Sequence, residues 1–191
     1  MTTLDHRSPL VLDTRELSRR PGSMRVVRRG VEAPADLGTA VVGVAEGSPV
    51  ELDLRLEAVM EGVLVSGTAR ATSTGECVRC LDPLERELVV DLQELYTYPG
   101  RAPEDDPDGT QDDLHELDGD HLDVEPVLRD AVVLALPFQP VCSPDCPGLC
   151  ADCGVRLADA EPGHHHDSVD PRWAALQGLA SDRGRTYSQE D

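Results

Sequence analysis

The sequence contains no lysine, and this absence narrows the chemistry open to the protein. A P-loop needs a lysine at its phosphates, and Schiff-base catalysis needs a lysine amine, so both are excluded. The 17 basic residues are all arginines and stand against 37 Asp and Glu, which gives a formal net charge of −20. Such a charge argues against non-specific coating of nucleic acid, so any RNA contact must be local.

Aromatic residues and long apolar stretches are also scarce. The chain has one Phe, one Trp and three Tyr, too few for a sheet that stacks RNA bases. No segment approaches the roughly 18 to 20 apolar residues that span a bilayer, and the N-terminus lacks the apolar region of a signal peptide. We therefore expect a cytoplasmic protein with no membrane partner. Its 191 residues suffice for one ordinary domain with extensions.

Three segments alternate between apolar and polar residues, as strands with one buried face do. The clearest begins at Val50 and continues through Leu52, Leu54 and Leu56, with charged residues between them. Residues 63–74 and 84–92 repeat the alternation on either side of a cysteine-bearing turn. Residues 9–12 predict a short strand, and residues 14–20 predict one or two helical turns before Pro21-Gly22.

An amphipathic helix is predicted after the acidic region. Apolar residues from Val124 to Ala135 follow the helical period, with Asp123 as N-cap and Pro137 as the stop. The predicted fold class is thus α+β: a mainly antiparallel sheet, one packed helix and a zinc-stabilised C-terminal region. We expect a single domain over 1–180, with an acidic mobile loop at about 100–121, a Cys-rich segment at 141–154, a short helix at 170–176 and a disordered tail at 181–191.

Six cysteines carry the strongest chemical signal. Cys77 and Cys80 form one C-x2-C pair, and four more thiols lie within twelve residues: Cys142, Cys146, Cys150 and Cys153. In a reducing compartment such spacing indicates zinc, because a C-x2-C turn aims two thiolates at one point and tetrahedral zinc needs two such pairs. Three groupings are open: the four C-terminal thiols, the two C-x2-C pairs, or Cys77 and Cys80 with Cys142 and Cys146. Buried thiols without metal are the simpler alternative.

The third grouping would leave Cys150 and Cys153 in need of partners. His164, His165 and His166 are candidates for a second, Cys2His2 site. We favour a solvated loop with incidental imidazoles, because the spacing and flanks match no helical H-x3-H element. Gly154 directly follows Cys153, and a glycine at this position predicts a left-handed backbone conformation.

A local cluster of arginines stands out against the acidic background. Residues 7–29 contain seven arginines and two acids, a local balance of +5. We take Arg19, Arg20, Arg28 and Arg29 as candidates for contact with RNA phosphate or an acidic partner. A solvated face paired with the chain's own acids is an equal alternative.

No catalytic motif is visible. The sequence lacks G-x-S-x-G, H-E-x-x-H and G-x-G-x-x-G, and neither C-x2-C pair begins a helix as redox pairs do. We therefore expect no enzyme and no small-molecule substrate. A hydrolase with an open zinc position beside the histidines is a weaker alternative.

Three motifs together resemble the YceD family, the large ribosomal RNA subunit accumulation proteins. They are Glu76-Cys-Val-Arg-Cys-Leu-Asp-Pro83, Asp130-Ala-Val-Val-Leu-Ala-Leu-Pro137 and Cys146-Pro-Gly-Leu-Cys-Ala-Asp-Cys-Gly154. The closing Asp170-Pro-Arg-Trp-Ala-Ala-Leu176 resembles actinobacterial members. The resemblance implies a non-enzymatic factor that supports accumulation or processing of large-subunit ribosomal RNA. Members often carry one more Cys near the position where this chain reads Pro162-Gly-His-His165.

The partners that this resemblance implies are large-subunit ribosomal RNA or ribosomal proteins of the large subunit. A chain of charge −20 suits a second hypothesis as well, an acidic adaptor that binds a basic ribosomal protein without touching RNA.

Overall fold

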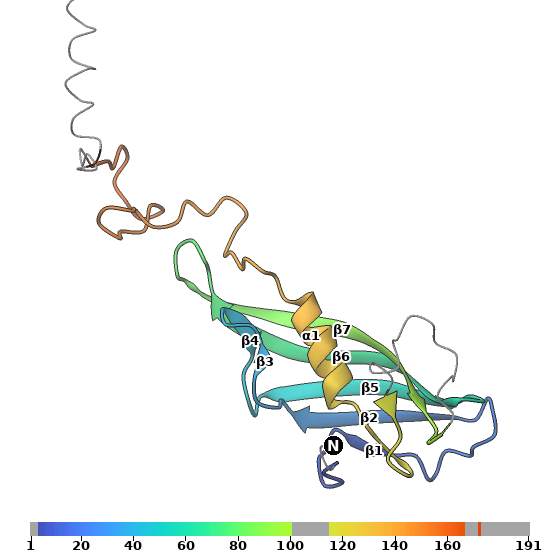
Figure 1. The fold of residues 1–191 in the computed structure, drawn as a ribbon. Helices are drawn as coiled ribbons and strands as arrows, with labels where there is room; N and C mark the ends of the chain where they lie inside the picture. The colour runs from blue at the N-terminus through green and yellow to red at the C-terminus, as the bar shows by residue number, and fades with distance from the viewer. Residues whose placement is uncertain (1–3, 101–114, 167–171, 173–191) are drawn as a thin grey trace, which may run out of the picture. The chain divides into compact units, whose positions relative to one another are not determined.

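The computed structural model describes residues 4–100, 115–166 and 172. The chain forms two compact units, Met1–Pro144 and Asp145–Asp191. The described regular elements all lie in the first unit (Figure 1). None of the helices in the described part of the chain is long and apolar enough to cross a bilayer.

The first unit is built around a mainly antiparallel sheet. Its long strands are neighbours in the order β2–β5–β6–β7, namely Met24–Glu32, Pro49–Ala58, Gly62–Glu76 and Pro83–Thr97. β6 also pairs with β4 (Val42–Val44), which pairs with β3 (Leu37–Gly38), and the end of β7 pairs in parallel with β8 (His115–Glu116). A separate two-stranded sheet joins β1 (Val11–Asp13) to β9 (His121–Asp123).

The alternation in β5 determines the two faces of the sheet. Val50, Leu52, Leu54 and Leu56 are at most 2% exposed, whereas the charged residues between them face outward. Directly opposed residues of antiparallel neighbours share a face, so the register carries this division across β2 and β6. The predicted strands at 50–56, 63–74 and 84–92 are confirmed as β5, β6 and β7.

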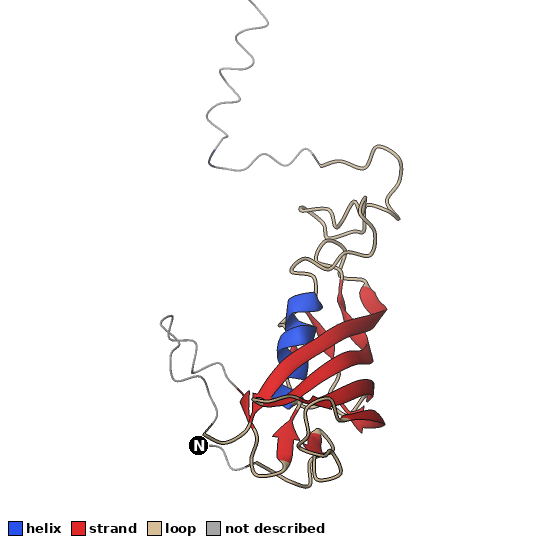
Figure 2. Cartoon of the chain, turned by 90° about the vertical axis from the view of Figure 1, so that its right-hand side faces the viewer, coloured by secondary structure: helices blue, strands red, loops and turns tan. Residues whose placement is uncertain are grey.

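Helix α1 (Glu125–Ala135) covers the apolar face (Figure 2). Leu128 and Val132 project from it into the core and are 0% and 1% exposed. The predicted N-cap was one residue too early: the cap is Val124, and Asp123 ends β9. The Asp123 carboxylate still accepts a hydrogen bond from the Glu125 N–H at 3.0 Å, and the helix ends two residues before Pro137.

The core includes residues far apart in sequence. Leu12 of β1 and Leu122 of β9 belong to the same buried cluster as the inward residues of β5. The Tyr96 hydroxyl donates to the Asp123 carbonyl at 2.7 Å, and burial raises the pKa of this phenol well above its usual range. The predicted α+β class, a mostly antiparallel sheet with one packed helix, is confirmed.

One sequence expectation in the first unit is wrong, and one strand was not anticipated. Residues 14–20 form turns and bends instead of helical turns; the Leu17 N–H bonds to the Thr14 carbonyl, three residues back. Strand β2 was not predicted, because its inward positions alternate arginine with valine.

Several expected segments lie wholly or partly outside the described residues. Residues 101–114 of the predicted acidic loop are not described, whereas its end carries β8 and the start of β9. Of the expected helix at 170–176 only Arg172 is described, and none of the expected tail at 181–191 is. The single domain over 1–180 stays a prediction.

The described part of the second unit has little regular secondary structure and little apolar burial. Within the described residues 145–166, the one β-bridge joins Leu149 to Arg156. Between residues 147 and 166, no hydrophobic side chain is buried. Apolar burial therefore contributes little to the structure of residues 147–166.

Candidate metal centres

The two C-x2-C turns have the same backbone construction. The Leu81 N–H donates to the Cys77 carbonyl at 2.8 Å, and the Gly154 N–H donates to the Cys150 carbonyl at 2.9 Å. In both turns, the residue that follows the second cysteine of the pair has a left-handed backbone conformation, with φ of 60° at Leu81 and 72° at Gly154. The conformation predicted for Gly154 is confirmed, and Leu81 adopts it despite its side chain.

Three hydrogen bonds fix the segment 140–144 against the first turn. The Val78 N–H donates to the Pro140 carbonyl at 2.9 Å, and the Arg79 guanidinium donates to the Pro144 carbonyl at 3.2 Å. Arg86 of β7 donates to the Val141 carbonyl. These contacts bring Cys142 beside a turn that precedes it by more than sixty residues, and the Cys80 and Cys142 sulfurs lie 3.6 Å apart.

The first group of potential ligands is Cys77, Cys80 and Cys142 together with Cys146. All four sulfur atoms lie within 4.8 Å of one another. Sulfurs bound at about 2.3 Å to one tetrahedral zinc are about 3.8 Å apart, close to the Cys80–Cys142 separation. Cys77, Cys80 and Cys146 are 0%, 6% and 5% exposed. Four sulfurs would fill a tetrahedral ion's coordination sphere, as in a closed structural site.

Local electrostatics favour the metal-binding form of Cys77. Burial raises the pKa of its thiol, but the backbone N–H groups of Cys142, Cys80 and Arg79 outweigh this effect and lower the pKa to about 6. A thiol with this pKa is mainly thiolate at pH 7, and the thiolate is the form that binds metal.

The second group is Cys150, Cys153, His164 and His166, whose ligand atoms also lie within 4.8 Å of one another. The Cys153 sulfur is 3.5 Å from His164 Nε2 and 3.2 Å from His166 Nε2, and the two imidazole nitrogens are 3.1 Å apart. The N–H groups of Cys153 and Asp152, with the His164 side chain, lower the pKa of Cys150 to about 6. This group is more exposed than the first.

These two groups correspond to the third of the groupings that the sequence left open. The structure places the His164 and His166 side chains beside Cys150 and Cys153, whereas the His165 Nδ1 lies 2.8 Å from the Gly163 carbonyl. Their i, i+2 spacing was the available signal, because alternate residues of an extended segment project to one side. Ligation by the six cysteines stays a prediction.

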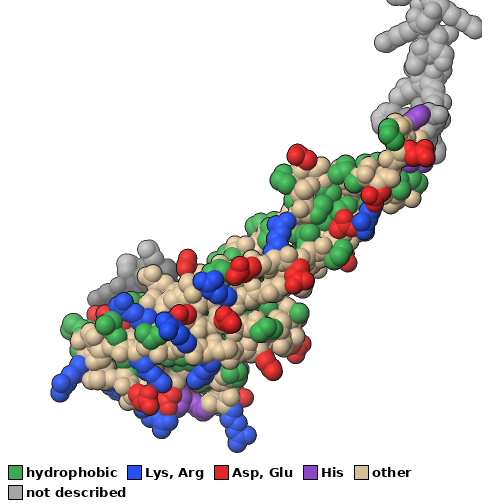
Figure 3. All heavy atoms as spheres, turned by 180° about the vertical axis from the view of Figure 1, so that it is seen from behind, with side chains coloured by type: hydrophobic (Ala, Val, Ile, Leu, Met, Phe, Trp, Pro, Cys, Tyr) green, Lys and Arg blue, Asp and Glu red, His purple; other side chains and the backbone are tan. Residues whose placement is uncertain are grey.

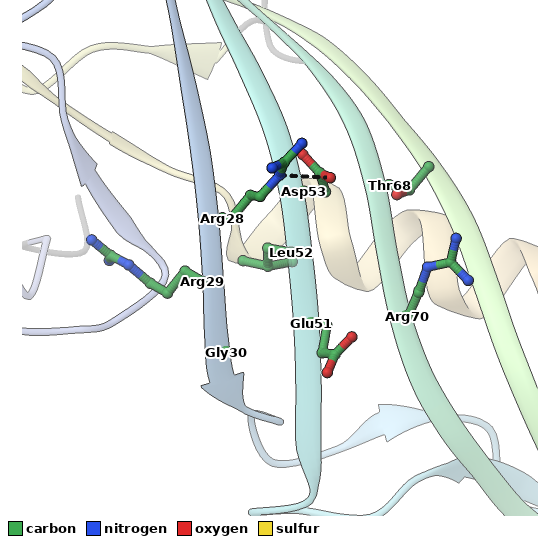
Figure 4. A pocket seen from close by; sticks show the side chains of 8 residues that line it. All are labelled: Arg28, Arg29, Gly30, Glu51, Leu52, Asp53, Thr68 and Arg70. Atoms are coloured by element: carbon green, nitrogen blue, oxygen red, sulfur yellow. Dashed lines mark hydrogen bonds and ion pairs between the residues drawn. The ribbon is translucent and has the colours of Figure 1, made fainter.

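The four candidate arginines do not form one patch. Arg19 pairs with Asp120 at 2.9 Å and lies over the Tyr98 ring, and Arg28 pairs with Asp53 at 3.1 Å. Arg29 extends to the other side of β2 (Figure 4), where it donates to the Pro9 carbonyl at 2.8 Å. Among described residues, the Arg20 guanidinium has no ion-pair partner.

The sheet face opposite α1 is polar and of mixed charge (Figure 3). It has a hollow of about 380 Å³ whose lining includes Arg28, Thr68 and Arg70 together with Glu51 and Asp53 (Figure 4). Across the whole face the acids are more numerous; they include Glu51, Asp53, Glu57, Glu85, Glu87 and Asp91, against Arg28, Arg55 and Arg70.

Fold and site together define a small α+β protein with two cysteine-containing groups that could each hold a metal ion. Comparison with known proteins identifies the family. The model of the large ribosomal RNA subunit accumulation protein YceD matches residues 65–180. The chain belongs to this family, as its cysteine and helix motifs predicted.

Relatives support the assignment. An uncharacterized protein of Mycobacterium tuberculosis is 46% identical over 183 residues, which cover 96% of this chain and 87% of the relative. An uncharacterized protein of Mycobacterium leprae is 44% identical over 182 residues, covering 94% and 82%. A chloroplastic protein of Zea mays, called YCED homolog 1, is 26% identical over 155 residues, covering 64% and 52%. No solved structure gives a match.

Proposed function

We propose that this protein is a non-enzymatic cytoplasmic factor that supports accumulation of large-subunit ribosomal RNA. The observation that carries the proposal is its membership of the YceD family, whose description names this role. The matched residues 65–180 include both metal-ligand groups and helix α1. The Zea mays relative carries the same description in its name.

The metal of the first group is zinc in this proposal, and its role is structural. Support comes from the donor set, because four thiolates in a largely buried site suit tetrahedral zinc. A complete set of four sulfur ligands offers no open position for a reacting water. This arrangement supports a non-catalytic role and counts against the hydrolase alternative for this group.

For contact with RNA, the hollow on the open sheet face is the place that we favour. Arg28 and Arg70 flank it with the Thr68 hydroxyl, and such groups bind phosphate oxygens. A Cβ added at Gly30 would meet nothing within 4 Å, so the hollow is open to a ligand at this point. Glu51 and Asp53 in the same lining would restrict binding to one or two phosphates.

A second candidate function is an acidic adaptor that binds a basic ribosomal protein. Two observations favour it: acids outnumber arginines on the open face, and Arg19, Arg28 and Arg29 are already occupied by groups of this chain. An excess of acids attracts a basic protein and repels an RNA backbone.

Deletion of the gene in its native host tests the proposed function. Mature large-subunit RNA is expected to fall relative to small-subunit RNA, and the wild-type gene should restore it. Unchanged RNA levels at every growth temperature would contradict the ribosomal role.

Complementation of that deletion separates the two modes of action. The double variant Arg28→Glu, Arg70→Glu should fail to restore the RNA if these side chains meet phosphate, and loss of two contacts should reduce the salt slope of RNA binding by about 2. The matched control is Arg55→Glu, on the same face beside Glu57, which should restore it. Full rescue by the double variant, with a basic ribosomal protein retained after nuclease treatment, would favour the adaptor.

A further inference from the structure

Residues 147–166 have too little apolar burial to fold as ordinary globular protein does. No hydrophobic side chain in this stretch is buried, and Leu149 and Leu157 remain in contact with solvent. The backbone bonds are few: Cys150 N–H to the Val155 carbonyl and Leu157 N–H to the Gly148 carbonyl are typical, at 2.8 and 2.9 Å. Segments of this size usually need a disulfide or a metal for stability.

The side chains of this stretch nevertheless converge on one point. His164 and His166 approach the two cysteines from a turn fixed by the bond from the His164 N–H to the Glu161 carbonyl at 3.0 Å. Their rings lie at 83° with centroids 4.7 Å apart, so that both Nε2 atoms face Cys153. His165, between them, is excluded from the group and lies against the Gly163 carbonyl.

We propose that Cys150, Cys153, His164 and His166 form a second zinc site, independent of the four-cysteine group, and that residues 148–166 fold only when this site is filled. Two sulfurs and two imidazole nitrogens are a standard tetrahedral donor set for zinc. Two thiolates balance the charge of Zn²⁺, which suits a site nearer to solvent than the first. The free energy of binding the ion is then the free energy that folds the segment.

The proposal does not rest on the ribosomal role, and metal titration of the full-length reduced protein tests it. Co²⁺ serves as the probe because its visible spectrum reports sulfur and nitrogen ligands. The wild type is expected to bind two equivalents. His164→Ala and His166→Ala should each bind one tight equivalent, and the matched control His165→Ala should bind two.

A conservative variant guards against a purely steric effect. His164→Cys keeps a ligand at the position, so it should again bind two equivalents, with a spectrum shifted toward sulfur coordination. One equivalent in the wild type, or two in His164→Ala and in His166→Ala, would overturn the proposal.

Limited proteolysis of the same proteins tests the coupling to folding. Cleavage between residues 148 and 166 should be slow in the zinc-loaded wild type and in His165→Ala. It should become fast after chelation and in His164→Ala even with zinc present. Equal protection with and without metal would contradict metal-dependent folding, whatever the stoichiometry.

Discussion

Leu81 adopts a backbone conformation that usually belongs to glycine. Its φ of 60° matches that of Gly154 in the second turn, and a β-carbon in this region costs roughly 1 to 2 kcal/mol. The side chain recovers little through burial, since it is 57% exposed. The turn tolerates the strain because the hydrogen bond to Cys77 and the adjoining strands hold it in place.

Replacing Leu81 by glycine should therefore stabilise the first unit. We expect Leu81→Gly to raise the free energy of unfolding by up to about 1 kcal/mol, the relief of strain being partly offset by the entropy of the unfolded chain. Val78→Gly is the control, because Val78 lies in the same turn without a positive φ. That control should lower stability, as measured by urea unfolding. A loss of stability in both variants would mean that Leu81 is not strained.

The two candidate metal centres illustrate what could be predicted from the sequence at the level of single residues. The C-x2-C spacing identified Cys77 and Cys80 as a pair, because three-residue spacing is a local property. The sequence offered the grouping with Cys142 as one of three but could not select it, since the choice depends on how the segment 140–144 bonds to a turn more than sixty residues earlier. The proximity of His164 and His166 to Cys153 was not expected, because their i, i+2 spacing matches no helical ligand motif.

At the scale of elements, prediction succeeded where one face is apolar throughout. Strand β5 places valine or leucine at every inward position from Val50 to Leu56, and α1 buries Leu128 and Val132, one helical turn apart. Strand β2 was missed because Arg25 and Arg29 take inward positions at the sheet edge. There the guanidiniums reach the carbonyls of Asp13 and Pro9 instead of a hydrophobic core.

The packing of α1 can be measured with two leucines of the same helix. Leu128 is 0% exposed and Leu134 is 85% exposed. Leu128→Ala should lower the free energy of unfolding by about 2 to 5 kcal/mol through lost burial and a cavity. Leu134→Ala should change it by less than about 0.5 kcal/mol. Equal effects of the two substitutions in thermal or urea unfolding would contradict this packing.

At the scale of the whole molecule, strand pairings differ greatly in the sequence distance that they span. Strands β6 and β7 pair along all fifteen residues of β6 and are joined by the six residues 77–82. Strands β1 and β9 pair across most of the sequence of the first unit. Beside them, the Thr14 hydroxyl donates to the Asp120 carbonyl, 106 residues away.

This difference implies an order of folding. Closing a short loop costs less entropy than closing a long one, so the β6–β7 hairpin should belong to the folding nucleus and β1–β9 should join late. Leu92→Ala in β7 should then slow refolding, whereas Leu122→Ala in β9 should mainly accelerate unfolding. Stopped-flow rates across a urea series distinguish the two, and the reverse pattern would contradict the order. The cysteine turn would thus form with the first hairpin, before the N-terminal strand has docked.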